Sequence, residues 1–272
     1  MPENPICCGT IQSQHARGLR EVAVVIPYSP SYTPELMLNK AKASVKKQQI
    51  PTNIIIVENE IGPAYGRNQG IKQADARYVA FLDADDKWYD QKLVRQLDRL
   101  AKTESGICVE GPEMGQEKFI SELLQDRLNS LTSSIVIDTE QVSTQFREEL
   151  ERFEDHCFMI EAALEAGVCF CEDLVEVRKH ADGLSSENNT EIIYRNRKKM
   201  ADILASETNV PGDLIHTYRS QAHYVAAIQR RKAGEFTPAF RRLVKSIRCK
   251  PSKENLRSIA ALPGFAVLNS LR

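Results

Sequence analysis

Short apolar runs alternate with amphipathic segments through the first part of the chain. The runs 21–27 (EVAVVIP), 53–60 (NIIIVENE) and 78–82 (YVAFL) are rich in Val and Ile and end in proline or acids, which is typical of buried strands. A helix is predicted to begin at Thr33-Pro34, and residues 62–76 read as a glycine-punctuated loop that leads into a short helix. Alternating strands and helices predict an α/β fold whose mostly parallel sheet is flanked by helices.

The pattern continues less regularly in the second part of the chain. Residues 133–137 read as a strand, 154–166 as a helix, 168–177 as a strand or hairpin arm, and the chain after about residue 190 as helical. A stretch rich in Ser and Asn, 183–190, is predicted to separate the α/β part from a basic helical extension. The expected organisation is an N-terminal tail 1–20, an α/β domain 21–188 with halves of about 21–102 and 103–188, and a C-terminal region 189–272.

Composition narrows the cellular setting. The 272 residues include seven cysteines without a C-x-x-C pair, which favours small buried thiols in a reducing cytosol over a disulfide framework or a zinc site. The first thirty residues lack the pattern of a signal peptide, and no apolar run approaches the roughly 20 residues of a membrane span. We therefore expect a cytoplasmic protein, soluble or peripheral at the inner face of the cell membrane.

Charge is distributed unevenly, although the net charge is only -1. Residues 194–272 hold 16 Lys and Arg against 5 Asp and Glu, a balance of +11, and the rest of the chain has a balance of -12. Such asymmetry indicates either a surface for an anionic partner or two subdomains that dock on each other. Nucleic acid is not the expected partner, because aromatic residues are sparse in the basic region and no reader motif is present.

The segment 236–272 contains a predicted basic amphipathic helix. Phe240, Leu243, Val244 and Ile247 have helical spacing, and they are surrounded or followed by Arg241, Arg242, Lys245, Arg248 and Lys250. One interpretation is a helix packed on the core with solvated arginines. The other is contact with an anionic membrane surface that holds the protein beside a lipid-linked acceptor.

The strand 78–82 ends abruptly in acids, in the sequence YVAFLDADDKWYD. A helix that begins near Asp90 and continues through Leu93 to Leu100 explains one or two of these acids, because carboxylates are favourable at a helix N-terminus. Such a helix does not explain why Asp83, Asp85 and Asp86 directly follow a buried strand. Hard oxygen ligands of this kind suit Mg²⁺ or Mn²⁺ bound together with water and phosphate oxygens. The sequence contains neither a P-loop nor a G-x-G-x-x-G after its first strand, so phosphate binding is expected to use a cation and side chains.

Three polar segments fall at predicted strand ends: Pro27-Tyr28, Glu58-Asn59 and Asp83 to Asp85. In parallel α/β sheets, ligands bind outside the carboxyl ends of the strands. We therefore predict a single binding site formed by these segments.

Four segments in order, VAVVIPYSP, GRNQGI, YVAFLDADDKW and FEDHCF…VRKHADGLS, resemble glycosyltransferase family 2, the nucleotide-sugar-dependent transferases of the GT-A fold. The resemblance covers roughly Val22 to Ser186. It implies that Asp83 and Asp85 form the family's D-x-D motif, with Asp83 near the ribose and Asp85 on the Mn²⁺ or Mg²⁺ that bridges the diphosphate. Asp86 extends the acidic cluster toward water or the donor sugar.

The same resemblance assigns the remaining candidates. Pro27, Tyr28 and Glu58 match positions that line the nucleoside pocket, and Arg67 and Asn68 match a loop beside it. Asp155 matches the general base, with Glu154 as its neighbour, although both are also ordinary acids for the first turn of a helix. His180 matches a histidine that approaches the metal or diphosphate in some relatives.

The sequence departs from the family at its second strand. That strand ends Glu58-Asn59-Glu60 where the family often has Asp-Asp-Gly-Ser, and the following helix and strand are missing, which predicts a smaller sheet. The expected function is inverting transfer of a sugar from a nucleotide-diphosphate donor to a hydroxyl of a glycan or lipid-linked acceptor. One alternative is a nucleotidyltransferase, but that class is expected to have a glycine-rich loop after the first strand, which this chain lacks. The other alternative is a non-catalytic protein that binds a nucleotide sugar or acts as a scaffold.

Overall fold

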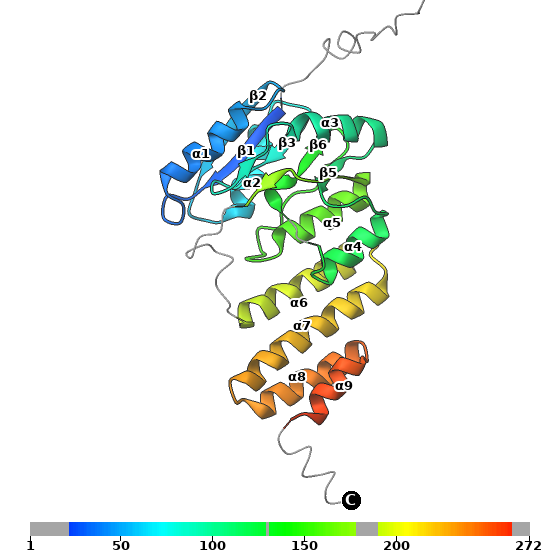
Figure 1. Ribbon diagram of the computed structural model, residues 1–272. Coiled ribbons are helices and arrows are strands. Elements are labelled where there is room, and N and C mark those ends of the chain that lie inside the picture. The colour runs from blue at the N-terminus through cyan, green and yellow to red at the C-terminus, as the bar shows by residue number, and fades with distance from the viewer. Residues whose placement is uncertain (1–21, 129–130, 178–189, 263–272) are drawn as a thin grey trace, which may run out of the picture.

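The computed structural model describes residues 22–128, 131–177 and 190–262, and Figure 1 shows a sheet with its flanking helices at one end and a stack of helices toward the C-terminus. The six-stranded sheet has the order β2-β1-β3-β6-β5-β7. Its strands are β1 (Val22–Tyr28), β2 (Thr52–Glu58), β3 (Tyr78–Phe81), β5 (Ile107–Glu110), β6 (Val136–Asp138) and β7 (Val168–Cys171). β1 runs parallel to β2 and β3, β5 runs parallel to β7, and β6 is antiparallel to both of its neighbours. The predicted α/β fold with a mostly parallel sheet is confirmed.

Helices cover both faces of this sheet, as the alternating side chains of β1 show. Val22 and Val24 point into one apolar layer with α1 (Glu35–Lys46) and α3 (Lys92–Thr103). Ala23 and Val25 point into the other layer, which contains α2 (Pro63–Gln73), α4 (Gln116–Leu124) and α5 (Glu154–Ala166). The strand is apolar at every position because both of its faces are buried.

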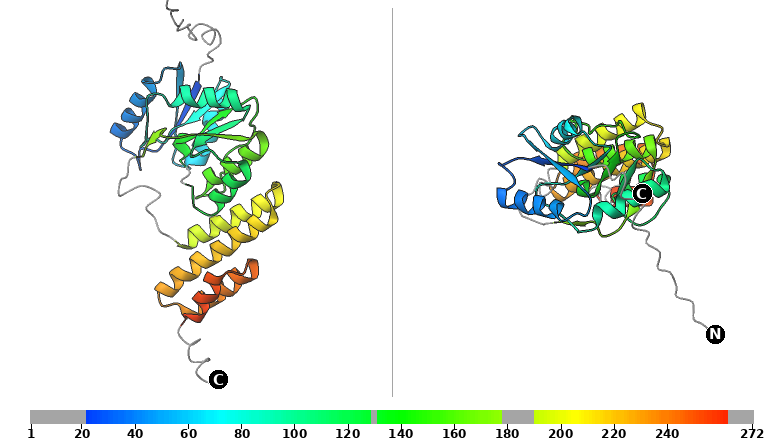
Figure 2. Two further views of the ribbon diagram at one scale, coloured as in Figure 1. Left: turned by 45° about the vertical axis from the view of Figure 1, so that its right-hand side comes forward. Right: turned by 90° about the horizontal axis from the view of Figure 1, so that it is seen from above.

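The C-terminal helices continue the second of these layers. α6 (Thr190–Glu207) and α7 (Gly212–Lys232) contribute Met200 and Tyr218 to the apolar cluster that contains Phe158 of α5. α8 (Phe236–Cys249) packs on α7, and together with α9 (Lys253–Ala260) it forms the end of the stack seen in the left view of Figure 2. The hydrophobic core therefore extends into the first two helices of the predicted basic region.

The segment predicted as a glycine-punctuated loop is helical from Pro63 onward, which corrects the placement of Arg67 and Asn68 in a loop. Gly66 and Gly70 lie one turn apart on the face of α2 that meets β1. A β-carbon at Gly70 would lie 2.2 Å from Cγ1 of Val25. These glycines are thus required for close helix–strand contact, which is why their loop-like appearance in the sequence was misleading.

Other boundaries differ in the second part of the chain. α3 is preceded by Gln91, not Asp90, as its N-terminal cap. Residues Thr132–Ser134 form a 3-10 helix, η1, before the short strand β6. The stretch 168–177 contains β7 and β8 (Val175–Glu176), and β8 pairs with β4 (Lys87–Trp88) in a separate two-stranded ribbon. β5 and α4 were not predicted.

Candidate active site

The carboxyl ends of β1, β2 and β3 meet as predicted. Tyr28 pairs in register with Glu58, and Val25 pairs with Phe81, which Leu82 and Asp83 follow directly. Tyr28 is buried and Glu58 is exposed, while Pro27 is half-buried between the neighbouring strands. The candidate nucleoside-binding residues therefore line one edge of the sheet beside the acidic loop.

Arg67 joins the two acidic motifs of the chain. Its guanidinium donates from Nη2 to Oδ1 of Asp83 at 2.8 Å and from Nη1 to Oε1 of Glu154 at 2.9 Å. The side chain is only 3% exposed, and it lies 5.1 Å from the ring centre of Phe146. Arg67 thus lies between the D-x-D loop and the start of α5, two segments far apart in the sequence.

Electrostatics explain why this cation is buried there. Burial opposes the charged form of Arg67, but the charges of Asp83 and Glu154 raise its pKa above the usual value. Burial raises the pKa of Glu154, and Asp155 adds to this shift while Arg67 opposes it. The carboxylates are therefore crowded, and Arg67 supplies the charge that keeps them close.

The acidic loop presents its side chains in two directions. Asp83 and Asp85 are partly exposed, with about 32% of the Asp83 side chain accessible. Asp86 is buried, and its Oδ2 accepts a hydrogen bond from Ser133 at 2.7 Å. Asp86 thus supports the loop from behind, whereas Asp83 and Asp85 border the solvent.

Two partly exposed carboxylates fit a divalent cation that takes its other ligands from water and phosphate. Within the described part of the chain, no group of three or more His, Cys, Asp or Glu side chains is arranged as a metal cage. The candidate ligand His180 lies outside the described residues. Asp83 and Asp85 supply two carboxylates, so a cation held by them would take its remaining ligands from water or from a bound ligand.

α5 begins with the Glu-Asp pair predicted from the sequence. The residue before it, Phe153, has φ of 66°, a left-handed conformation that is uncommon for an aromatic residue. Glu154 is buried against Arg67, whereas Asp155 is partly exposed. Oδ1 of Asp155 accepts from the His156 backbone N–H at 2.8 Å, and Oδ2 accepts from the Thr132 hydroxyl at 3.3 Å. Glu154 contacts Arg67 and Asp155 contacts Thr132. Acids that only stabilise the N-terminus of a helix do not need such side-chain partners.

Asn68 contacts a different segment from Arg67. Its amide exchanges two hydrogen bonds with the backbone of Phe146, at 2.8 and 2.9 Å, and donates to Glu148 at 2.8 Å. These contacts hold the loop between β6 and α5. Residues 144–149 of this loop line a cavity of about 400 Å³ together with Asn68 and Glu161.

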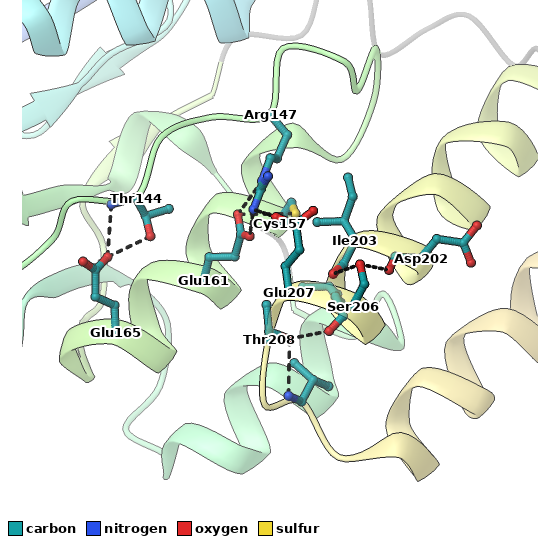
Figure 3. Close-up of polar contacts among 12 residues, drawn as sticks. Thr144, Arg147, Cys157, Glu161, Glu165, Asp202, Ile203, Ser206, Glu207 and Thr208 are labelled. Atoms are coloured by element: carbon teal, nitrogen blue, oxygen red, sulfur yellow. Dashed lines mark hydrogen bonds and ion pairs between the residues drawn. The ribbon is translucent and has the colours of Figure 1, made fainter.

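The same loop is also held from its other side, as Figure 3 shows. Arg147 points toward α5 and α6, where it contacts Glu161 at 3.1 Å and Glu207 at 2.8 Å. The backbone N–H of Thr144 donates to Glu165 at 3.0 Å. The loop is therefore fixed by α2, α5 and α6 together.

Sequence reasoning missed three contributors: the bridging role of Arg67, and the contacts of Thr132 and Ser133. The sequence TSS before an apolar run predicts a loop or the start of a strand. Nothing local indicates that Ser133 contacts Asp86, 47 positions away, or that Thr132 contacts Asp155, 23 positions away.

Comparison with known proteins identifies the family. A family model described as glycosyl transferase family 2 matches residues 9–166, more than half of the chain. The chain belongs to glycosyl transferase family 2.

Curated glycosyltransferases match only short segments. A putative teichuronic acid biosynthesis glycosyltransferase of Bacillus subtilis is 46% identical over 46 residues, 17% of this chain and 18% of that protein. The amylovoran biosynthesis glycosyltransferase AmsB of Erwinia amylovora is 34% identical over 67 residues, 25% of this chain and 22% of that protein. This chain thus aligns with about a fifth of the length of these relatives.

Solved structures share the fold over most of the chain. TarS of S. aureus, residues 1–349 in complex with UDP-GlcNAc, has a TM-score of 0.60 at 17% identity and covers 85% of this chain and 82% of its own. The mannosyltransferase PcManGT of Pyrobaculum calidifontis, in complex with GDP-Man and Mn²⁺, has a TM-score of 0.54 at 12% identity, covering 93% and 81%. At these identities the likeness shows the GT-A fold.

We expect Arg67→Met to lower the free energy of unfolding by about 3–5 kcal/mol, because it leaves two crowded carboxylates without their buried partner. Urea denaturation measures the change. The matched control is Arg195→Met, which removes an arginine that is 61% exposed and paired with Glu151, and whose loss should cost about 0–1 kcal/mol.

Adding Asp83→Asn and Glu154→Gln to Arg67→Met should recover much of the lost stability, since the uncompensated charges are then gone. Equal losses for Arg67→Met and Arg195→Met would show that the buried bridge has no special energetic role.

Proposed function

We propose that this protein transfers a sugar from a nucleotide-diphosphate donor to an acceptor hydroxyl with inversion at the anomeric carbon. The observation that carries the proposal is the Arg67 bridge, because it holds the donor-side Asp83 and the acceptor-side Glu154 at one place. Membership of the family supports nucleotide-sugar chemistry. The two neighbouring structures in complex with UDP-GlcNAc and GDP-Man support a nucleoside diphosphate as the leaving group.

In the proposed reaction, Asp155 accepts the proton of the acceptor hydroxyl as its oxygen attacks the anomeric carbon. The new carbon–oxygen bond forms while the bond from that carbon to the diphosphate oxygen breaks, and the electron pair leaves with the nucleoside diphosphate. A single displacement of this kind inverts the anomeric configuration. Glu154 is bound to Arg67 and buried, so it orients the start of α5, and the partly exposed Asp155 takes the proton.

Asp83 and Asp85 would hold Mn²⁺ or Mg²⁺ together with the donor, and when bound the cation stabilises negative charge on the leaving diphosphate. Pro27, Tyr28 and Glu58 would line the nucleoside at the adjacent strand ends. Two curated relatives are named for teichuronic acid and amylovoran biosynthesis, which supports a glycan as the acceptor.

Asp85→Ala is expected to abolish transfer and to weaken Mn²⁺-dependent binding of UDP or GDP at least tenfold, because one of two carboxylate ligands is lost. Isothermal calorimetry with each nucleotide, with and without Mn²⁺, measures this. Asp75→Ala removes an exposed acid outside the loop and should leave binding unchanged. Wild-type affinity in the Asp85 variant with metal present would refute the metal assignment.

Asp155→Asn should keep nucleotide binding and lower the rate of transfer by roughly 10²-fold or more, the scale of general-base catalysis. Release of UDP or GDP from UDP-GlcNAc or GDP-mannose measures the rate. Glu151→Gln, at an exposed position four residues earlier, is the control. Transfer at the wild-type rate by Asp155→Asn would assign the base to another group, and donor binding without any turnover in the wild type would favour the non-catalytic alternative.

We also propose that α8 contacts an anionic lipid surface. Leu243 of the predicted stripe is buried against α7, but Phe236 and Phe240 remain 42% and 40% exposed, one turn apart. Arg241 and Lys245 are exposed nearby. Exposed aromatic rings beside basic residues suit the interface of an anionic membrane. No described helix has the length and low charge that a membrane span requires.

Vesicles of phosphatidylcholine with phosphatidylglycerol should co-sediment with the full chain at low salt, and high salt should release it, since each basic residue contributes about 1 kcal/mol near an anionic surface. Arg241→Glu with Lys245→Glu should abolish binding. The control Lys46→Glu with Lys47→Glu makes the same charge change on exposed residues of α1 and the turn after it. Equal loss in both double variants, or no sedimentation at low salt, would contradict a specific α8 surface.

A further inference from the structure

Ser133 fixes the acidic loop at several points. Its hydroxyl donates to Oδ2 of Asp86 at 2.7 Å and accepts from the backbone N–H of Asp83 at 3.0 Å. Its carbonyl accepts from the indole N–H of Trp88 at 2.7 Å. Because Ser133 is 1% exposed, water does not compete for these bonds. Ser133 therefore contacts the loop at Asp83, Asp86 and Trp88.

The preceding residue, Thr132, contacts Asp155 in the Glu-Asp pair at the start of α5. Its hydroxyl donates to Oδ2 of Asp155 at 3.3 Å, while the opposite oxygen of that carboxylate accepts the His156 backbone N–H at 2.8 Å. Thr132 is 5% exposed. Each oxygen of the Asp155 carboxylate thus accepts one hydrogen bond, and the two bonds restrict the orientation of the group.

The turn that presents these two side chains is itself anchored. The Ser134 hydroxyl accepts from the Glu110 backbone N–H at 3.1 Å, and its carbonyl accepts from the Gln96 side chain at 2.7 Å. Consecutive residues in a tight 3-10 turn cannot move independently. η1 is thus tied to β5 and α3 on one side and to both acidic motifs on the other.

We infer that Thr132 and Ser133 are positioning residues for the proposed transfer: Ser133 places the loop that carries Asp83 and Asp85, and Thr132 orients Asp155 toward the acceptor. This inference rests on the proposed function. Their adjacency in η1 sets the separation between the donor-holding loop and the base. Errors of about 1 Å in such a separation reduce turnover by about 10²-fold.

The test compares Thr132→Val, Thr132→Ser and Ser133→Ala in the full chain. Thr132→Val should lower kcat for release of UDP or GDP from UDP-GlcNAc or GDP-mannose by roughly 10- to 100-fold with the donor KM unchanged, and Thr132→Ser should restore it because the hydroxyl returns. Thr139→Val, which removes a threonine hydroxyl at the other end of β6, should have no effect.

Ser133→Ala should instead weaken Mn²⁺-dependent binding of UDP or GDP, measured by calorimetry, by about tenfold or more, because the loop with Asp83 and Asp85 loses two bonds. The control Ser220→Ala removes a buried serine hydroxyl in α7. Wild-type binding by Ser133→Ala, or a Thr132→Val defect that Thr132→Ser does not restore, would overturn the inference.

Amide hydrogen exchange separates this inference from the proposed function. Ser133→Ala should speed exchange at Asp83, and Thr132→Val should speed exchange at His156, whether or not the protein transfers a sugar. A wild-type protein that neither binds nor turns over these donors would refute the proposed function alone. Unchanged exchange at both amides would refute the positioning role of η1 alone.

Discussion

The buried Arg67 guanidinium is the constraint on which the rest of the site depends. A cation that is 3% exposed is costly unless its partners are close and correctly oriented. Those partners come from the loop after β3 and from the first turn of α5, so the sheet and α5 must be in place before the charge is compensated. The same requirement explains the glycines of α2, since only a helix lying close to β1 brings Arg67 to both carboxylates.

A buried polar layer behind the acidic loop complements this bridge. Lys92 is 1% exposed, donates to the Gln96 side chain at 2.6 Å and lies 4.1 Å from the centre of the Trp88 ring. Burial lowers the pKa of Lys92 to about 7. Gln96 in turn donates to the carbonyls of Cys108 and Ser134. A network of buried hydrogen bonds thus lies behind the loop, and buried networks whose polar groups are paired make a structure more rigid.

The C-terminal helices serve both the core and the site. Arg197 of α6 lies over the rings of Phe153 and Tyr218, at 4.8 and 5.4 Å, and forms an ion pair with Asp126. Phe153 is the residue with left-handed backbone at the start of α5, so α6 and α7 help to hold the turn that presents Asp155. α8 is attached to α7 through a separate small cluster of Ala227, Ala239 and Leu243, against which Ile259 of α9 packs. The apolar cluster of α8 is therefore separate from the contacts of α6 and α7 at the start of α5.

The sequence by itself determined the elements whose signal is local. The Val and Ile runs of β1 and β2 and the helix from Glu154 to Ala166 follow from residue pattern, and parallel pairing then places Tyr28, Glu58 and Asp83 together. Pattern could not reveal that α2 is helical through two glycines, because their role depends on the distance to Val25. Nor could it reveal that Arg67 meets Glu154, 87 positions away, or that Ser133 meets Asp86. Buried hydrogen bonds and ion pairs depend on which segments become neighbours, and only the tertiary structure decided that.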